Sequence, residues 1–444
     1  MSNWLITNAD IVNEGRRFHA DVRVRGGRIE AIAPSLSAKP DERVFDARGR
    51  LLIPGMIDDQ VHFRDPGLEY KGDFHTESRA AVAGGVTSFF EMPNSKPTTT
   101  TAAALADKHA RAAQKSLANY AFYFGATNDN LEEIKALDPR RACGIKVFMG
   151  ASTGNMLVDN PATLDGIFAA AAVPIVTHCE DTPTIEINLA AERLRYGDDI
   201  PVERHPYIRS REACIKSTLL ALQLARRHDA RLHVLHISTA EELALFEPGP
   251  IEGKRITAET CVHFLHFSEA DYATKGNLIK CNPAIKAASD RAAIIDALKT
   301  GRIDVLATDH APHTLEEKQQ SYEKAPSGLP LVQFVLQCTL ERWFDGQLPI
   351  ELIVEKTAHA SAKLFGVRDR GFIREGYCAD LTMIDLQAPQ TVRREDVISK
   401  CGWSPFEGYT FRSSIAATWV NGHLAWNGSK LDDAQLGQRL EFNR

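Results

Sequence analysis

Residues 211–239 have the sequence REACIKSTLLALQLARRHDARLHVLHIST, in which a helix-like stretch is followed by a short strand-like run. Residues 211–230 mix apolar and charged side chains over a length typical of a helix that covers a sheet. Residues 231–239 place aliphatic side chains in a short run, as expected for a strand of a buried parallel sheet. This stretch therefore predicts one helix–strand unit of an α/β fold.

The same alternation occurs eight times along the chain. The strand-like runs are GMIDDQVHF (55–63), VTSFFEMP (86–93), YAFYFGATN (120–128), CGIKVFMG (143–150), PIVTHCE (174–180), RLHVLHIST (231–239), RITAETCVHFL (255–265) and IDVLATDHAP (303–312). Eight strand–helix units predict a closed (β/α)₈ TIM barrel.

The two ends of the chain have a different character. Residues 1–54 alternate as short strands separated by turn residues, and residues 371–385 and 414–429 return to this pattern. We therefore expect one small β-sandwich built from both termini. The predicted segments are 1–54 for the first part of the sandwich, 55–368 for the barrel, and 369–444 for the rest of the sandwich and a tail.

Bulk composition restricts the class of protein. The chain has 444 residues, 44% of them hydrophobic, and a formal net charge of −6. It has no long basic run, no apolar stretch of about 20 residues and no signal-peptide pattern, so we expect no nucleic-acid or membrane partner. The eight cysteines form no C-x-x-C pair, which favours reduced thiols in a cytoplasmic protein. We also expect a homo-oligomer, although no motif defines one.

Polar side chains follow six of the eight predicted strands. In a TIM barrel the carboxyl ends of the strands carry the active site. A single histidine in an apolar strand is more often a hydrogen-bonded core residue, but six such ends predict a site. Imidazole and carboxylate suit zinc, which activates water for hydrolysis of an amide. The residues are His62, Arg64, Asn94, Lys146, His178, His236, Asp309 and His313.

Lys146 is unusual because it lies between apolar residues in CGIKVFMG. One interpretation is a lysine that reaches the rim of the barrel or forms a salt bridge. The other starts from burial, which lowers the pKa of an amine and favours its neutral form. A neutral amine can add carbon dioxide, and the resulting carbamate has two oxygens that can bridge two metal ions.

Five stretches together resemble a known family. They are PGMIDDQVHFRDPG (54–67), GIKVFMG (144–150), VTHCED (176–181), HVLHIST (233–239) and ATDHAPH (307–313). They are similar to motifs of the amidohydrolase superfamily and, within it, of the cyclic amidohydrolases, which comprise dihydroorotases, hydantoinases and allantoinases. The resemblance covers nearly the whole chain, and its terminal strands are similar to the composite sandwich of that family.

The resemblance implies a role for each matching residue. His62, carboxylated Lys146 and Asp309 would surround one metal ion, and Lys146, His178 and His236 would surround another. Asp309 would be the catalytic residue that moves the proton. The expected cofactor is zinc, as one or two ions.

Substrate choice depends on fewer residues. Arg64 can bind a carboxylate with two hydrogen bonds, although an arginine in an exposed salt bridge is the commoner case. Dihydroorotases are similar to this chain at Arg64, which implies reversible hydrolysis of dihydroorotate to N-carbamoyl-L-aspartate. A hydantoinase or allantoinase, whose ring lacks that carboxylate, and a non-catalytic dihydroorotase-like subunit are the alternatives. The implied substrate-binding residues are His62, Arg64, Asn94, Asn282 and His313.

Gln60 departs from the family pattern, because it occupies the position of the first metal-binding histidine. A neutral amide oxygen is a weaker zinc ligand than imidazole. Three interpretations stay open: Gln60 binds metal through its oxygen, the protein holds one metal tightly, or the chain is an inactive relative. The presence of Asp309, Arg64 and His313 favours an active enzyme.

Overall fold

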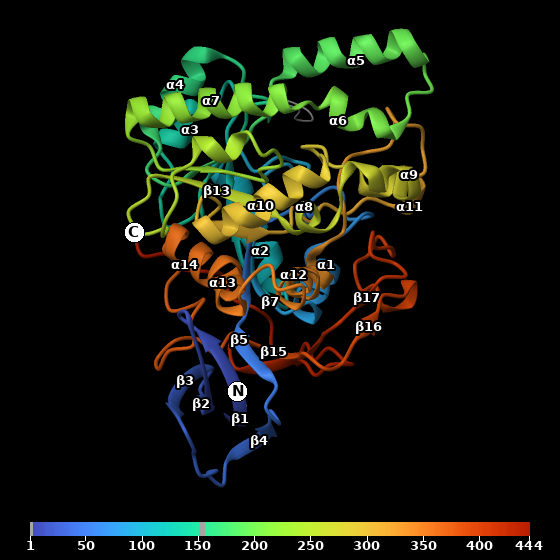
Figure 1. The fold of residues 1–444 in the computed structure, drawn as a ribbon. Coiled ribbons are helices and arrows are strands. Elements are labelled where there is room, and N and C mark those ends of the chain that lie inside the picture. Colours follow the sequence, from blue (N-terminus) through green and yellow to red (C-terminus); the bar gives the residue numbers. More distant parts are fainter. Residues whose placement is uncertain (1–2, 151–155) are drawn as a thin grey trace.

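The structure is a computed structural model that describes residues 3–150 and 156–444. A closed barrel of eight parallel strands forms its centre, with β9 continuing β8 (Figure 1). Val61 pairs with His310, and the His62 N–H donates to the His310 carbonyl at 2.7 Å, which joins the last strand to the first. The strands are β6 (Met56–Val61), β7 (Val86–Glu91), β8 (Asn119–Phe122), β9 (Phe124–Gly125), β10 (Ile145–Phe148), β11 (Ile175–His178), β12 (Leu232–Val234), β13 (Ile256–Cys261) and β14 (Val305–Ala307).

Helices surround this barrel, and their boundaries follow from capping residues. α2 (Ala102–Lys115) begins after Thr101, whose hydroxyl accepts from the Ala104 N–H. α7 (Arg211–His228) begins after Ser210 in the same way and ends at Asp229 in a left-handed conformation. The other helices are α1 (Phe74–Ala83), α3 (Leu131–Lys135), α4 (Pro161–Ala170), α5 (Thr182–Tyr196), α6 (His205–Ile208), α8 (Val262–His266), α9 (Tyr272–Lys275), α10 (Ala288–Thr300), α11 (Leu315–Lys318), α12 (Val335–Phe344), α13 (Ile350–Val354) and α14 (Ala360–Phe365).

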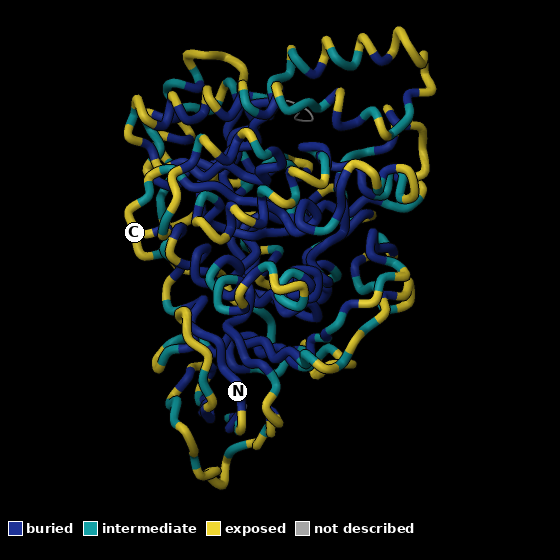
Figure 2. Tube along the Cα trace, viewed as in Figure 1, coloured by how far each residue is buried: buried dark blue, intermediate teal, exposed yellow. Residues whose placement is uncertain are grey.

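Residues are buried most completely in the barrel and less so in the helices around it. Figure 2 shows the barrel strands almost entirely buried, whereas α5 is largely exposed. All eight cysteines are free thiols and six are buried, as the sequence predicts. None of the helices in the described part of the chain is long and apolar enough to cross a membrane.

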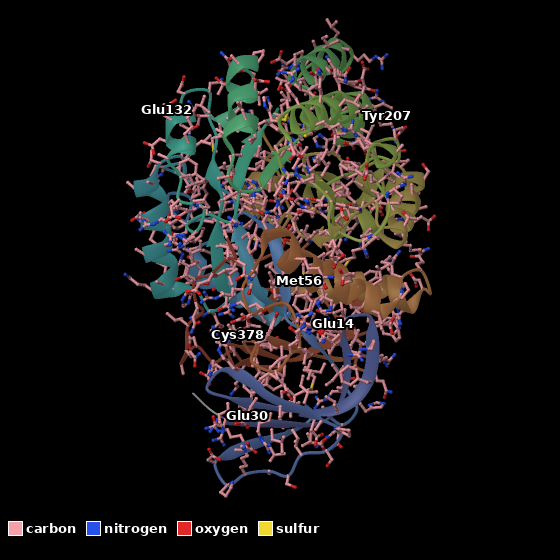
Figure 3. All side chains as sticks on the ribbon, turned by 90° about the vertical axis from the view of Figure 1, so that its left-hand side faces the viewer. Glu14, Glu30, Met56, Glu132, Tyr207 and Cys378 are labelled. Carbon is pink, nitrogen blue, oxygen red and sulfur yellow. The ribbon has the colours of Figure 1, made fainter. Side chains whose placement is uncertain are left out.

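Strands from both termini form one eight-stranded sheet at one end of the molecule (Figures 1 and 3). β5 and β15 pair antiparallel and so join the two ends of the chain. Trp419 contacts Trp4 and Phe45 edge-on, with ring centroids 6.3 and 5.1 Å apart, so the sheet folds over an apolar core. The predicted fold class is therefore confirmed. The strands are β1 (Asn3–Asn13), β2 (Arg16–Arg25), β3 (Arg28–Ala33), β4 (Glu42–Asp46), β5 (Leu51–Pro54), β15 (Leu381–Asp385), β18 (Ser414–Val420) and β19 (His423–Trp426), and β16 (Gln390–Thr391) pairs separately with β17 (Thr410–Phe411).

Asp380 connects this sheet to the barrel. Its buried carboxylate accepts from the Asn421 N–H at 2.7 Å and from the side chain of Asn119, at the start of β8, at 3.2 Å. Arg370 forms an ion pair with the same carboxylate. A buried carboxylate with three partners is costly to disrupt, because each partner is left without a hydrogen bond.

We expect Asp380→Ala to lower the free energy of unfolding by about 3–5 kcal/mol, since it leaves the Arg370 charge buried and unpaired. Urea titration followed by circular dichroism measures this difference. Asp385→Ala is the matched control on the same sheet, because the carboxylate of Asp385 accepts from the nearby Gln387 N–H and a change at such a site stays within about 0.5 kcal/mol. Equal losses in both variants would show that Asp380 does not couple the sheet to the barrel.

Candidate active site

Most of the predicted site residues lie at or just after the carboxyl ends of the barrel strands, whereas Lys146 lies within β10 and Asn282 lies in a later loop. Figure 3 shows Met56, which opens β6, between Glu30 of the terminal sheet and Tyr207 of α6. Three site residues that are not glycine have positive φ: Arg64 at 71°, His236 at 42° and Asp309 at 52°. Such a conformation costs about 1–2 kcal/mol at each position. Backbone strain of this kind is typical of functional sites.

His62, Gln60 and Asp309 meet where the first strand lies beside the last. The His62 Nδ1–H donates to the Asn94 Oδ1 at 2.7 Å, so His62 Nε2 carries a lone pair. That Nε2 lies 3.2 Å from Asp309 Oδ1. Two electron-rich atoms this close need a cation or a proton between them. The Gln60 Nε2–H donates to the same Asp309 oxygen at 3.0 Å.

A second group of side chains comes from β11 and the loop after β12. His178 Nδ1 and His236 Nε2 face each other at 3.0 Å. The opposite nitrogen of His178 donates to Glu180 at 2.9 Å, and Arg209 holds that carboxylate at 2.5 Å. Burial opposes the charge of Glu180, but Arg209 and His178 lower its pKa to about 2. A carboxylate that orients a histidine in this way is common behind metal-binding imidazoles.

The histidines of both groups are kept neutral by burial. It lowers the pKa of His62 and of His178, and it lowers the pKa of His236 well below its usual value, with help from the nearby His178 and Lys146. A neutral imidazole is the form that binds a metal ion. The charge state of these side chains therefore suits metal binding.

Lys146 lies in β10 with 1% of its surface exposed. Burial lowers the pKa of its amine to about 8, although Asp309 and Glu259 act in the opposite direction. Its Nζ lies 4.6 Å from the centre of the Phe148 ring. The first interpretation of the sequence, a lysine that reaches the rim, is therefore wrong, because the side chain is enclosed.

Arg64 and His313 form a buried cationic group beside these residues. The Arg64 Nε–H donates to the Pro312 carbonyl at 3.1 Å, and Arg64 Nη2 lies 3.0 Å from His313 Nε2. The ammonium of Lys71 donates to His313 Nδ1 at 2.9 Å. His313 Nε2 also lies 3.0 Å from the Ser327 carbonyl, so each ring nitrogen of His313 faces a cationic donor. Two cationic side chains therefore converge on the His313 ring.

Asn94 and Asn282 lie differently from the other site residues. Within the described part of the chain, the side chain of Asn94 hydrogen-bonds His62 rather than Arg64. The Oδ1 of Asn282 is buried and has no hydrogen-bond partner there. The neighbouring carbonyl of Lys280 accepts from the Gly328 N–H at 2.9 Å, and Gly328 lies beside His313.

Four residues of the site were not predicted from the sequence. Glu180 follows His178 by two positions, so the stretch THCE contained a signal for it. Both ring nitrogens of His263, which follows β13 directly, are buried without a partner in the described residues, and burial lowers its pKa to about 4. His263 gives the seventh strand a polar end as well. The four residues are Lys71, Glu180, Arg209 and His263.

Comparisons with known proteins place these features in context. Residues 51–425 match the Amidohydrolase family. The chain is 34% identical to a dihydroorotase of Halobacterium salinarum over 92% of this chain and 93% of that protein. It is 32% identical to an allantoinase of Bacillus velezensis over 98% and 97% of the two chains. Among solved structures, it is similar to the L-hydantoinase (dihydropyrimidinase) of Arthrobacter aurescens, with a TM-score of 0.93, 28% identity and coverage of 99% and 100%.

We expect Lys146 to form a carbamate in metal-free protein, and more of it as the pH rises through 8. With a pKa of about 8, roughly a tenth of the amine is neutral at pH 7 and about nine-tenths at pH 9. ¹³C NMR in ¹³C-labelled bicarbonate detects the carbamate carbon. The signal should be absent in Lys146→Met, and an unchanged signal in that variant would assign it to another amine.

Proposed function

Because the chain belongs to the amidohydrolase family and is a cyclic amidohydrolase, we propose that its reaction is that of a dihydroorotase, the reversible hydrolysis of dihydroorotate to N-carbamoyl-L-aspartate. The observation that carries this proposal is the buried guanidinium of Arg64 beside the neutral His313, within the same strand-end site as Asp309. A buried cation needs a counter-anion, and the ring carboxylate of dihydroorotate supplies one.

The substrate carboxylate binds to Arg64, whose guanidinium offers two parallel N–H donors. His313, whose Nε2 lies 3.0 Å from Arg64 Nη2, lines the same position. Lys71 adds a second positive charge beside His313, with its Nζ 2.9 Å from His313 Nδ1. Asn94, Asn282 and His62 complete the pocket in this proposal.

The donor set fits zinc ions. Lys146, carboxylated, would hold one together with His62 and Asp309, and another together with His178 and His236. The fit rests on the lone pair of His62 that faces Asp309 and on the two imidazole nitrogens that face each other at 3.0 Å. When bound, zinc supplies an activated water and polarises the carbonyl of the scissile amide.

Asp309 moves the proton in this proposal. One of its oxygens is held by the Gln60 amide at 3.0 Å, so its carboxylate keeps a fixed direction. It takes a proton as water adds to the ring carbonyl and returns that proton to the departing ring nitrogen. In the reverse direction the same carboxylate removes the proton from the attacking nitrogen.

A hydantoinase or allantoinase is the second candidate, favoured by the similarity to the allantoinase of B. velezensis and the L-hydantoinase of A. aurescens. A non-catalytic subunit is the third, and protein that lacks both zinc and turnover would favour it. A cytoplasmic location and a homo-oligomeric state stay predictions. Turnover of dihydroorotate, hydantoin and allantoin, measured with the zinc content of the same sample, separates the three.

We expect Arg64→Lys to lower kcat/KM for dihydroorotate by about 10- to 100-fold, since it removes a charged hydrogen bond worth about 1.5–3 kcal/mol. Turnover of an uncharged ring should change far less. Coupled absorbance assays on both rings give the ratio. Arg28→Lys, at an exposed ion pair of the terminal sheet, is the control. Equal losses on the two substrates would contradict a carboxylate-binding role for Arg64.

We expect the position next to Gln60 to lose its zinc first during graded chelation. It has one imidazole, whereas the position at His178 and His236 has two, and imidazole is the better zinc donor. Metal counting by mass spectrometry should show two stages of loss from the active site. In the Gln60→His variant, we expect both zinc ions to be lost in a single stage. Equal retention at both positions, unchanged in Gln60→His, would show that Gln60 does not weaken the site.

A further inference from the structure

A second group of potential metal ligands lies inside the barrel, and none of its members belongs to the site proposed above. Asp59 in β6, His233 in β12 and Glu259 in β13 each have 0% of their surface exposed. One ligand atom from each lies within 4.8 Å of the other two. β12 and β13 pair with each other, whereas β6 reaches them through β14, so closure of the barrel brings Asp59 to the other two residues.

The protonation of His233 is fixed by its neighbours. The Thr257 hydroxyl donates to the Leu232 carbonyl at 3.3 Å, so its oxygen accepts the Nδ1–H of His233, 2.8 Å away. His233 Nε2 then carries a lone pair in the neutral ring. It lies 3.5 Å from Asp59 Oδ2 and 3.6 Å from Glu259 Oε2. Both distances exceed those of ordinary N–H to O hydrogen bonds.

Four polar atoms of this group have no hydrogen-bond partner among the described residues: Asp59 Oδ1 and Oδ2, Glu259 Oε2 and His233 Nε2. No lysine or arginine there pairs with either carboxylate. Unpaired buried carboxylates are strongly unfavourable. Burial opposes a charge on His233, but Asp59 and Glu259 raise its pKa to about 9. The group therefore attracts positive charge, and the 3.5 and 3.6 Å separations are longer than hydrogen bonds from a proton on His233 Nε2 would give.

We propose that Asp59, His233 and Glu259 bind a divalent metal ion in the core of the barrel, separate from the ions held at the strand ends. Ligands about 2.0–2.2 Å from a tetrahedral ion lie roughly 3.4 Å from one another, close to the 3.5 and 3.6 Å separations around His233 Nε2. Asp59, His233 and Glu259 supply three corners of such a set, one from each side chain, because the two oxygens of one carboxylate lie too close together to occupy two corners. Two carboxylates and one imidazole suit Zn²⁺.

Such an ion would stabilise the strands beneath the active site. It would tie β6 to β12 and β13 across the barrel. The other oxygen of Glu259, Oε1, accepts from the His236 N–H at 3.3 Å. The ion would thus fix the backbone of His236 through Glu259, with no contact to substrate.

Anomalous diffraction from crystals of the native protein grown with Zn²⁺ tests the proposal directly. Data above and below the zinc edge should show a peak within about 2.5 Å of the three ligand atoms. A refined structure with peaks at His178 and His236 but none between Asp59, His233 and Glu259 would overturn the proposal, whatever the substrate of the enzyme. In that case His233 carries a second proton and serves as the counter-charge.

Metal counting in variants gives a second test. Lys146→Ala removes a ligand proposed for both strand-end ions, and this variant should retain one equivalent of zinc after chelation. Adding Asp59→Asn should remove that equivalent. Asp304→Asn is the matched control in the same background, because Asp304 is a buried barrel carboxylate paired with Lys254 at 2.8 Å. Retention of the equivalent in the Asp59 variant, or its loss in the Asp304 control alone, would contradict the assignment.

Discussion

Closure of the barrel between β14 and β6 is the constraint on which the site depends. The hydrogen bond from the His62 N–H to the His310 carbonyl places Gln60 and His62 against Asp309, although these residues are far apart in the sequence. His310 is itself held from the other side. Its Nε2–H donates to Glu77 of α1 at 2.8 Å, and its Nδ1 accepts from the Leu331 N–H at 2.9 Å. The strained turn at Asp309 is therefore fixed on both flanks by buried hydrogen bonds.

The low polarity of this enclosed region then decides which groups are charged. Burial lowers the pKa of Lys146 to about 8 and also lowers the pKa of His178 and of His236, so these two imidazoles are neutral bases. Glu180 stays charged because Arg209 neutralises it. Burial also raises the pKa of Glu259 and of Asp58, which lie deeper in the barrel and have no lysine or arginine paired with them in the described residues. One physical effect thus separates a layer of neutral nitrogen donors from a layer of excess acid beneath it.

The sequence predicts those features that repeat along the chain. Eight strand-like runs predict the barrel, and the polar residues that follow six of them predict that His62, His178, His236 and Asp309 lie at one end of it. Features that depend on contacts between distant segments could not be predicted. Arg209 reaches Glu180 from a loop 29 residues away, and Glu259 lies 200 residues from Asp59. Neither pair has a spacing that indicates contact.

Gln60 illustrates how a substitution can change a role rather than remove it. An imidazole nitrogen that binds metal has only a lone pair to offer, whereas an amide has both a donor and an acceptor. The Gln60 Nε2–H holds Asp309, and its Oε1 lies 3.8 Å from Cys261 Sγ. A half-turn of the amide would exchange these atoms and bring the oxygen to the side of Asp309. Without a cation, Gln60 can therefore orient the Asp309 carboxylate through its N–H. With a cation present, the turned amide can offer its oxygen as a ligand, and only the weak contact to the Cys261 thiol is lost.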